Sequence, residues 1–320
     1  MTQLNTTPWL PSTYGIEASQ DQNYTLEFSE DEAFEFLSVI FLLYITASLI
    51  PFICIFGLVG NAIVIWYLCF RIKKNPITTY VLNLAAADSA VLLSLGCLCI
   101  EFLLVYRDFS PWLFHCFLFT YTISQYLLTA ISAEKCLSVV FPIWYRCHRP
   151  KYLSALICTL LWIMSCLMSG HLLLFIVETL DLVLQITSIM NFVLCTSVVI
   201  ICTILLFIRT YCSLYQHRRG KFYVALVFIL LVFICFGTPL SVTFILFFFD
   251  VFNYPHSLYL LMISITCASI NSSVNPLIYF LIGRKKMKRS RQSFRLVLQR
   301  VFSDNVDCSV AGQSAPPVER

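Results

Sequence analysis

Long apolar segments alternate with short polar ones along this chain. A helix needs about 20 mainly apolar residues to cross the hydrocarbon core of a bilayer. Segments that reach this length with very few charges lie at residues 37–70, 77–104, 112–141, 153–177, 183–208, 222–250 and 256–282. Because the connections between them are short, we expect one antiparallel bundle. The pattern therefore predicts an all-α, seven-transmembrane helix bundle.

Composition supports a membrane protein over a soluble one. Hydrophobic residues make up 59% of the 320 residues, and charged residues only 12%. Soluble domains carry about 25% charged residues. We therefore expect a multi-pass protein of the plasma membrane, with the lipid bilayer as its surroundings and no nucleic-acid partner.

Lysine and arginine gather in every second connection, and this sets the expected orientation. They are Arg71, Lys73 and Lys74 in the first, Arg146, Arg149 and Lys151 in the third, and Arg218, Arg219 and Lys221 in the fifth, with seven more between residues 284 and 295. Connections on the other side hold only Arg107. Positive charge marks the cytoplasmic side, so the N-terminus is predicted to lie outside and the C-terminus inside.

Four regions follow from this orientation. Residues 1–36 carry seven acids and no base and are expected to be an extracellular segment, with glycosylation sequons at Asn5 and Asn23. No cleavable signal peptide is visible, so the first span is expected to act as the anchor. Residues 37–282 form the predicted transmembrane domain. Residues 283–303 read as an amphipathic, basic helix on the cytoplasmic membrane surface, and 304–320 as a disordered tail.

Several polar residues fall inside the predicted spans, where burial of polar groups is costly. Asp88 is the only acid in mid-membrane, and small alanines precede it in the stretch LAAAD. Polar residues at comparable depth are Asn61, Ser124, Asn271, Ser272 and Asn275. A carboxylate with hydroxyl and amide oxygens is suited to a hard cation such as sodium. A hydrogen-bonded packing network without an ion explains the same residues equally well.

Short motifs in four of the spans resemble those of rhodopsin-like G-protein-coupled receptors. These motifs are Gly60–Asn61, LAAAD, Trp162 and NPLIY at 275–279. The stretch AISAEKCLSVVFPIWYRCHRP, at 130–150, is similar to the Mas-related receptors, whose hallmark reads AIS-x-ERCLSV-x-x-PIWYRCHRP. The resemblance implies a receptor, not an enzyme, with an extracellular ligand and a heterotrimeric G protein as partners and no cofactor beyond a possible sodium ion.

The resemblance also implies roles for particular residues. Glu134, Lys135 and Cys136 occupy the place of the family's acid–arginine–aromatic motif, in which the acid holds the neighbouring base at rest and the base later faces the G protein. The other implied activation residues are Gly237, Pro239, Asn275, Pro276 and Tyr279. Gly237 stands where most rhodopsin-like receptors carry tryptophan. The implied sodium pocket comprises Asp88, Ser124, Asn271, Ser272 and Asn275.

Lys135 departs from the family's usual arginine. Lysine keeps the positive charge but lacks the planar fork that forms paired hydrogen bonds. One reading is a coupling receptor with altered strength, and the alternative is a non-coupling or decoy receptor of the same fold.

The expected outer mouth is mostly acidic. Its acids are Glu101, Asp108, Glu178, Asp181 and Asp250, against Arg107 alone. Phe117 replaces the aspartate of amine receptors, the seventh span has no lysine for retinal, and Ser110 replaces the usual third-span cysteine. Negative charge attracts cations, so a cationic peptide or amphiphile is the expected ligand. Glu178 or Asp181 is the candidate for the acid that Mas-related receptors use on the fifth span, whereas Leu172 stands at the fourth-span position.

Two other classes of membrane protein fit the sequence less well. An intramembrane enzyme needs a nucleophile–base pair or a metal motif such as HExxH, and neither is present. A channel or transporter predicts paired charges or inverted repeats within the spans, but Asp88 is alone at its depth.

Overall fold

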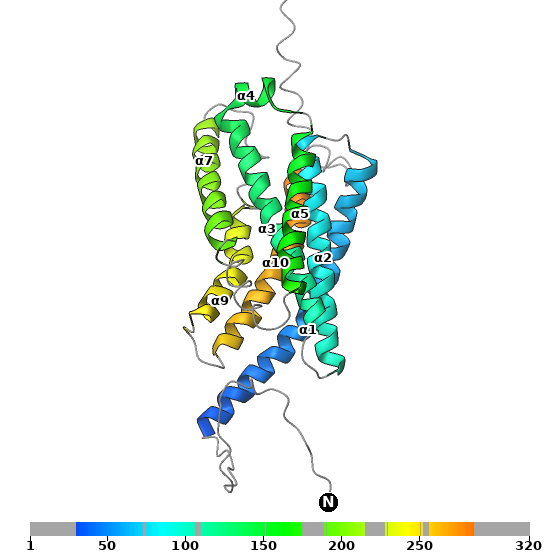
Figure 1. Cartoon of the computed structure of the whole chain (residues 1–320), viewed down its shortest axis with the longest axis vertical. Coiled ribbons are helices and arrows are strands. Elements are labelled where there is room, and N and C mark those ends of the chain that lie inside the picture. The colour runs from blue at the N-terminus through cyan, green and yellow to red at the C-terminus, as the bar shows by residue number, and fades with distance from the viewer. Residues whose placement is uncertain are drawn as a thin grey trace, which may run out of the picture.

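The chain folds into an elongated helical bundle in the computed structural model (Figure 1). The structure describes residues 30–72, 75–105, 110–150, 152–174, 189, 191–214, 228, 230–249, 251 and 256–284. The helices are α1 (Glu30–Phe70), α2 (Pro76–Val105), α3 (Pro111–Val140), α4 (Pro142–Cys147), α5 (Leu153–Leu174), α7 (Ser197–Leu214), α9 (Pro239–Phe248) and α10 (His256–Arg284). Two π-helical turns, η1 (Asn191–Thr196) and η2 (Phe233–Gly237), precede α7 and α9. No strand occurs in these ranges, so the all-α prediction is confirmed.

Each of the seven predicted spans has a helical counterpart. Five helical segments are long and apolar enough to cross a membrane, within the ranges described: Leu37–Phe70, Pro76–Leu104, Trp112–Val140, Leu230–Phe247 and His256–Ile278. Two shorter apolar helices, Leu153–Leu167 and Val193–Ile208, stand for the fourth and fifth spans. The predicted amphipathic helix and tail, and nearly all of the N-terminal segment, lie outside the described residues.

The two ends of the bundle are distinct. Figure 1 shows α4 at one end and the start of α1 at the other. We call the α4 end the inner end, because the positive charges predict it to be cytoplasmic, and the opposite end the outer end.

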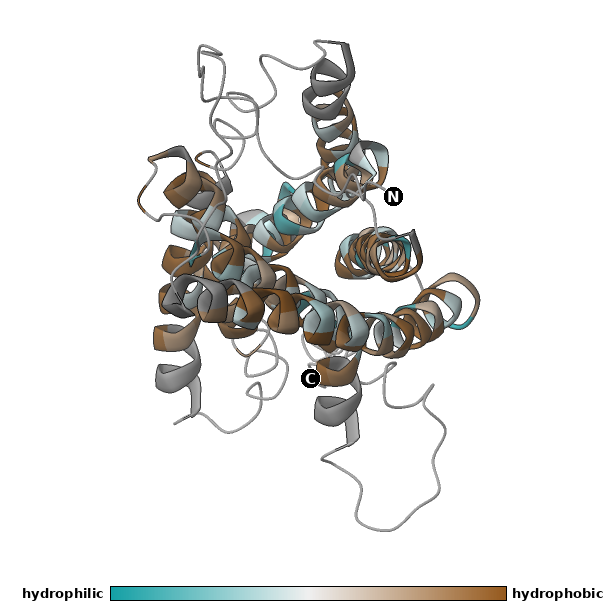
Figure 2. Cartoon of the chain, turned by 90° about the horizontal axis from the view of Figure 1, so that it is seen from below, coloured by the Kyte–Doolittle hydropathy of each residue, from teal (hydrophilic) through white to brown (hydrophobic). Residues whose placement is uncertain are grey.

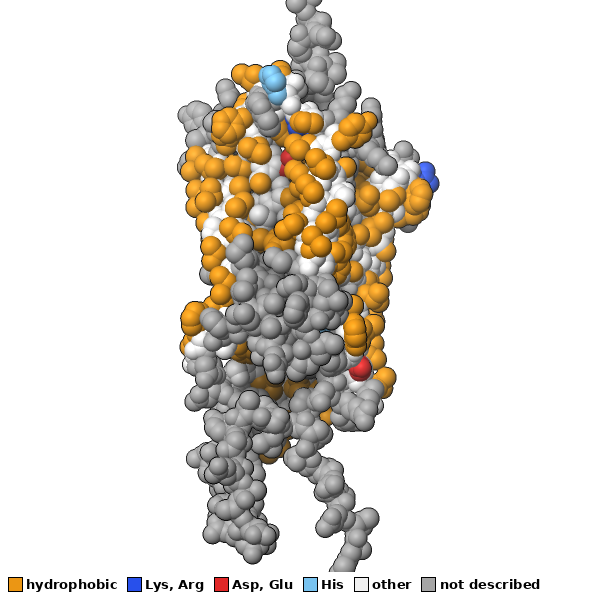
Figure 3. Space-filling view, viewed as in Figure 1, with side chains coloured by type: hydrophobic (Ala, Val, Ile, Leu, Met, Phe, Trp, Pro, Cys, Tyr) orange, Lys and Arg blue, Asp and Glu red, His pale blue; other side chains and the backbone are white. Residues whose placement is uncertain are grey.

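Hydrophobic side chains face outward over most of the bundle. Figure 2 shows largely hydrophobic helices, and Figure 3 shows hydrophobic side chains over the described flank with few charges. Phe52 on α1, for example, is 72% exposed. The polar residues predicted to lie within the spans are buried instead, as expected for a bundle whose solvent is lipid.

Local signals explain where α2 begins. Pro76 opens the helix, where its missing N–H costs nothing. The Asn75 side chain accepts a hydrogen bond from the Thr78 N–H at 2.8 Å, and the Thr78 hydroxyl accepts one from the Asn75 N–H at 2.8 Å. This reciprocal cap satisfies backbone donors that a helix start leaves open.

Glycines let α1 approach α10 closely. A Cβ on Gly57 would lie 2.4 Å from Ser273 Oγ and 2.7 Å from Leu92 Cδ1, and one on Gly60 would lie 3.1 Å from Pro276 Cβ. The Ser273 hydroxyl donates to the Ser269 carbonyl of its own helix at 2.8 Å. Small residues of this kind are how membrane helices pack, since lipid offers no hydrophobic driving force between them.

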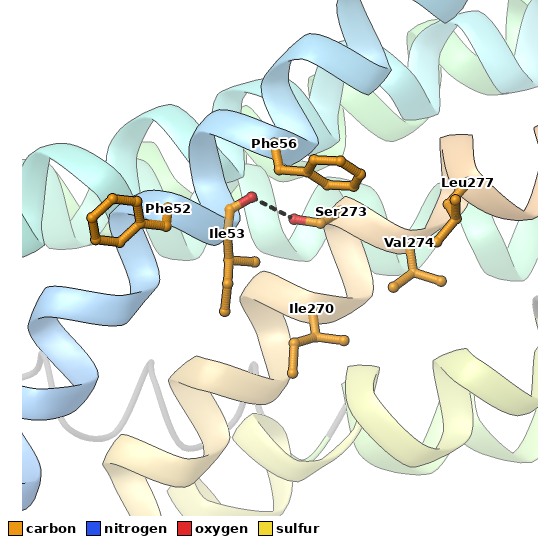
Figure 4. A pocket seen from close by; sticks show the side chains of 7 residues that line it. All are labelled: Phe52, Ile53, Phe56, Ile270, Ser273, Val274 and Leu277. Atoms are coloured by element: carbon orange, nitrogen blue, oxygen red, sulfur yellow. Dashed lines mark hydrogen bonds between the residues drawn. The ribbon is translucent and has the colours of Figure 1, made fainter.

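Beside this contact, a groove runs between α1 and α10 on the surface of the bundle (Figure 4). Its lining consists of Phe52, Ile53, Phe56, Ile270, Ser273, Val274 and Leu277. The Ser273 hydroxyl also lies 3.3 Å from the Ile53 carbonyl, so the one polar side chain of the lining is directed at backbone. The groove therefore offers hydrocarbon contacts to the surrounding lipid.

We predict that Gly57→Ala destabilises the bundle by about 1–3 kcal/mol, because the added methyl group forces α1 away from Ser273 and Leu92. The measurement is thermal unfolding of the detergent-solubilised protein. Gly96→Ala is the matched control, since its Cβ would make only ordinary contact with Cys54 at 3.6 Å. Equal melting temperatures for the two variants would contradict the close approach.

Candidate functional site

A buried carboxylate joins three helices at the centre of the bundle. Asp88 on α2 is completely buried. Ser124 on α3 donates its hydroxyl proton to Asp88 Oδ1 at 2.6 Å, and Asn275 on α10 donates from Nδ2 to Oδ2 at 2.9 Å. Hydrogen bonds to a carboxylate are strong, because they are charge-assisted. The three residues that the sequence placed at similar depth therefore meet in space.

Asn61 adds a fourth helix, α1, to these polar contacts. This α1 side chain donates to the Gly57 carbonyl at 3.0 Å and to the Ser272 carbonyl at 3.1 Å. More than one turn away on α2, Asn83 Oδ1 accepts the indole N–H of Trp162 on α5 at 3.1 Å. Polar contacts thus connect α1, α2, α3 and α10 near the level of Asp88, and a separate one connects α2 to α5.

Two buried amide oxygens at this level, Asn271 Oδ1 and Asn275 Oδ1, have no hydrogen-bond partner within the described residues, and the Ser272 hydroxyl lies within reach of the Asp88 carboxylate. Buried polar atoms normally have partners, so these oxygens need an explanation. Together with the Asp88 carboxylate and Ser124 hydroxyl they form an all-oxygen donor set, which is the chemistry of hard cations. The residues of the predicted sodium pocket therefore fit such an ion.

A second polar contact holds the bend of the sixth span against α3. Pro239 opens α9, and the π-helical turn η2 ends just before it at Gly237. Gln125 donates from Nε2 to the Gly237 carbonyl at 2.8 Å, and the Tyr121 hydroxyl donates to the same oxygen. The bend exposes this carbonyl, and α3 supplies two donors to it.

The fit at Gly237 leaves no room for a side chain. A Cβ there would lie 2.9 Å from Phe233 Cδ2 and 3.3 Å from Gln125 Nε2. A tryptophan at this position would clash with the Phe233 and Gln125 side chains. Sequence reasoning identified Gly237 and Pro239 but missed Gln125, although one glutamine within the apolar run YTISQYLL was an available signal.

The inner end of α3 carries the expected acid and base. Glu134, Lys135 and Cys136 are 5%, 3% and 8% exposed. Glu134 Oε1 accepts hydrogen bonds from the Tyr145 hydroxyl at 2.6 Å and from Arg149 Nε at 2.7 Å. These two partners were not predicted, although both lie in the stretch WYRCHRP that carried the resemblance.

Tyr145 stays a donor to this carboxylate. Its pKa is raised well above the usual range, first by burial and then by the hydrogen bond and negative charge of Glu134. A phenolate beside a carboxylate would be strongly unfavourable. Tyr145 therefore contributes a neutral hydroxyl, while Arg149 supplies the compensating charge.

At the outer end, two candidate ligand residues are described. The Glu101 carboxylate accepts the Ser110 N–H at 3.2 Å, which connects the last turns of α2 to the start of α3. Phe117 is completely buried, with its ring centroid 5.9 Å from that of Tyr121. Phe117 thus lies one turn nearer the outer end of α3 than Tyr121, which donates to the Gly237 carbonyl.

Glu178, Asp181, Asp250, Asn5 and Asn23 lie outside the described residues. Asn275 and Pro276 lie within α10, and so does the backbone of Tyr279, whose side chain is not among those described.

Comparison with known proteins gives a consistent result. Residues 60–279 match the family model of the 7 transmembrane receptor (rhodopsin family). The Proto-oncogene Mas of Homo sapiens is 35% identical over 267 residues, covering 78% of this chain and 81% of that protein.

Mas-related receptors match at similar identity. The Mas-related G-protein coupled receptor member X1 of Homo sapiens is 35% identical over 290 residues, covering 85% of this chain and 88% of its own. Member B2 of Mus musculus is 33% identical over 334 aligned positions, covering 98% and 93%. These relatives are receptors and not enzymes, as the sequence predicted. The chain therefore belongs to the rhodopsin family of seven-transmembrane receptors, and within it to the Mas-related G-protein-coupled receptors.

Proposed function

We propose that this plasma-membrane receptor binds a cationic peptide or amphiphile at its outer end and activates a heterotrimeric G protein at its inner end. The observation that carries the proposal is the row of buried contacts along α3. They involve Phe117, Tyr121, Ser124, Gln125, Glu134 and Lys135. One continuous helix thus connects the outer core, the bend at Gly237, the Asp88 centre and the acid–base pair.

The bend at η2 and Pro239 is the element that can change shape. Pro and π-helical turns are common causes of helix kinks. Tyr121 and Gln125 hold the bend to α3 through the Gly237 carbonyl, and Phe117 packs on Tyr121. A ligand that displaces the outer core would disturb this contact without any tryptophan at position 237.

The charge of the outer end supports a cationic ligand. Five acids and one arginine are expected near the mouth, and the 36 N-terminal residues add seven acids. A negative field raises the local concentration of cations and speeds their association. Aromatic residues close to the acids provide apolar contacts for an amphiphile.

A sodium ion is the second ligand that we propose. Asp88, Ser124, Asn271, Ser272 and Asn275 would hold it, and it would supply a positive charge to the buried carboxylate and a partner for the unpaired oxygens. An ion that binds one arrangement of the bundle in preference to others shifts the population toward that arrangement. We expect that arrangement to be the resting one.

The first prediction concerns this ion. Asp88→Asn removes the one formal negative charge at that depth, so sodium should no longer raise the melting temperature of the variant. The measurement is thermal unfolding in sodium chloride against choline chloride. Ser94→Ala is the control, because the Ser94 hydroxyl bonds only to the Ala90 and Val91 carbonyls of its own helix. Equal stabilisation of the wild type by both cations would exclude the site.

The second prediction concerns the mouth. Neutralising Glu178 and Asp181 together should lower the potency of a cationic agonist by about fivefold or more, because one exposed charge pairing contributes about 1 kcal/mol. Surface expression should stay unchanged. Replacing Glu17 and Asp21 removes the same charge from the N-terminal segment and is the control. If potency is unaffected by the first pair, the ligand binds elsewhere.

The third prediction tests coupling through Lys135. Lys135→Arg should raise agonist-driven G-protein activation, because guanidinium restores a delocalised fork of donors. Lys135→Ala should abolish activation, and both variants should keep ligand binding, since Lys135 lies at the end opposite the mouth. The measurements are agonist dose–response curves and ligand binding on the same membranes.

The decoy reading gives a different pattern for these variants. Wild type and Lys135→Ala would then be equally silent, and signalling would arise only in Lys135→Arg. A Lys135→Ala variant that signals as well as the wild type would rule out a coupling role for this residue.

A further inference from the structure

Helix α1 is longer than a bilayer crossing requires. Its 41 residues, Glu30–Phe70, rise about 60 Å, whereas the hydrocarbon core is about 30 Å thick. Arg71 follows the helix directly and marks the inner membrane surface. Counted from there, an upright helix leaves the hydrocarbon near Pro51, and one tilted by about 40° leaves it near Ile45. The turns before Ile45 therefore stand in the headgroup region or above it.

These outer turns are held beside the mouth. Figure 1 shows the start of α1 extending past the labelled helices at the outer end. We call residues 30–44 the outer arm. The Ser38 and Tyr259 hydroxyls form a hydrogen bond between the arm and α10, and the Tyr44 ring centroid lies 5.6 Å from that of Phe102 on α2. The arm is therefore fixed to the outer turns of α2 and α10.

The side of the arm that faces away from the bundle is apolar. Phe34, Leu37 and Phe41 are 76%, 63% and 69% exposed, whereas Val39 is 2% exposed. Their spacing of three and four residues places the three exposed side chains on one face of the helix. Two helices pack along an apolar seam with this same spacing. We call these three side chains the apolar stripe of the arm.

Negative charge is concentrated at the outermost turns of the arm. Residues 30–35 read EDEAFE, and no lysine or arginine precedes Arg71 in the chain. Glu30 is four residues before Phe34, so helical spacing places it on the same face as the apolar stripe. Acids in a first turn also favour the helix itself, because its N-terminus carries a partial positive charge. The arm thus combines an apolar stripe with an acidic end.

We propose that the outer arm of α1 is a docking site for a cationic amphipathic helix. The apolar face of that helix would pack on Phe34, Leu37 and Phe41, and its bases would pair with the acids of residues 30–35. Helices with apolar residues at such spacings are commonly recognised through these residues. The inference rests on the cationic ligand proposed above and adds the place where that ligand first binds. Because the arm is fixed beside the mouth, docking raises the concentration of the ligand there.

Two other occupants of the apolar stripe fit less well. A second copy of the chain in the same membrane would have to pack parallel to the first. This packing would bring the four acids of residues 30–35 against the same four acids of the other copy, and like charges across helices repel. Lipid tails end below the stripe at the tilts considered above. The charge of the arm therefore favours a basic partner.

The test uses the full-length receptor in nanodiscs of zwitterionic lipid, with empty nanodiscs as the blank. The probe is a helical leucine–lysine peptide whose leucines all lie on one face. A variant that combines Phe34→Ser, Leu37→Ser and Phe41→Ser should bind the peptide about tenfold more weakly or worse, because apolar contact is lost. The combination of Phe34→Leu and Phe41→Leu is the matched control. It keeps the stripe apolar and should change binding less than about threefold.

The charge of the arm is tested separately. Replacing the four acids of residues 30–35 by their amides should slow association and reduce its dependence on salt. A peptide with glutamate in place of each lysine should not bind the wild type.

Photochemical cross-linking shows where the peptide lies and does not depend on the serine variant folding well. A photoreactive residue in place of Leu37 should cross-link the peptide. The same residue in place of Phe52, which is 72% exposed but lies at the level of the hydrocarbon, should not.

Each outcome decides for or against the docking site. Equal binding by the wild type and the serine variant, or no cross-link at position 37, would overturn it, even if the peptide activates the receptor. Equal cross-linking at positions 37 and 52 would show partition into lipid only, and cross-linking between receptors without peptide would show a second copy on the stripe. Either result would overturn the site as well. Cross-linking at position 37 without any G-protein response would support the docking site and overturn the function proposed above.

Discussion

The cost of burying the Asp88 carboxylate in a membrane constrains the whole bundle. A charged side chain at this depth is unfavourable by about 2.5–3.5 kcal/mol or more, so it must find partners on other helices. Ser124 and Asn275 supply them from α3 and α10. Asn61 ties α1 to the same level of α10. Lipid provides no hydrophobic driving force for helix association, so the need to pair these buried polar groups selects one arrangement of the helices. Glycines such as Gly57 permit the close approach that this arrangement requires.

Buried polar groups are also paired at two other positions along α3, near the bend of the sixth span and at the inner end. At the bend of the sixth span, the group that needs donors is the Gly237 carbonyl, and Tyr121 and Gln125 provide them. At the inner end, the group is a second carboxylate, and the donors come from a connection. The three levels thus rest on different contacts: two donors to one carbonyl, hydrogen bonds to a buried carboxylate, and a buried ion pair. One helix contributes a polar group to each of them.

The sequence predicted the helical spans and placed Asp88, Ser124 and Asn275 at one depth, for a physical reason. Span length and polar depth are properties of the chain alone, so Asp88, Ser124 and Asn275 could be placed at one level before any contact was known. Two contacts could not be predicted. Gln125 meets the Gly237 carbonyl at the end of the π-helical turn η2, and Arg149 meets Glu134 from the connection that follows α4. Both depend on backbone paths that apolar periodicity does not encode.

Arg149 also bears on why lysine is tolerated at position 135. In a receptor where one base must both neutralise the neighbouring acid and later contact the partner, the planar fork of arginine serves the first task, since it pairs with a carboxylate through parallel hydrogen bonds. Here a different arginine performs that task, with Tyr145 as a second donor to Glu134 Oε1. Lys135 keeps a positive charge beside Glu134, but its ammonium group lacks the delocalised fork of donors that a guanidinium would offer to a partner. The substitution therefore leaves Glu134 paired with Arg149, and what it weakens is the contact with the G protein that we propose for position 135.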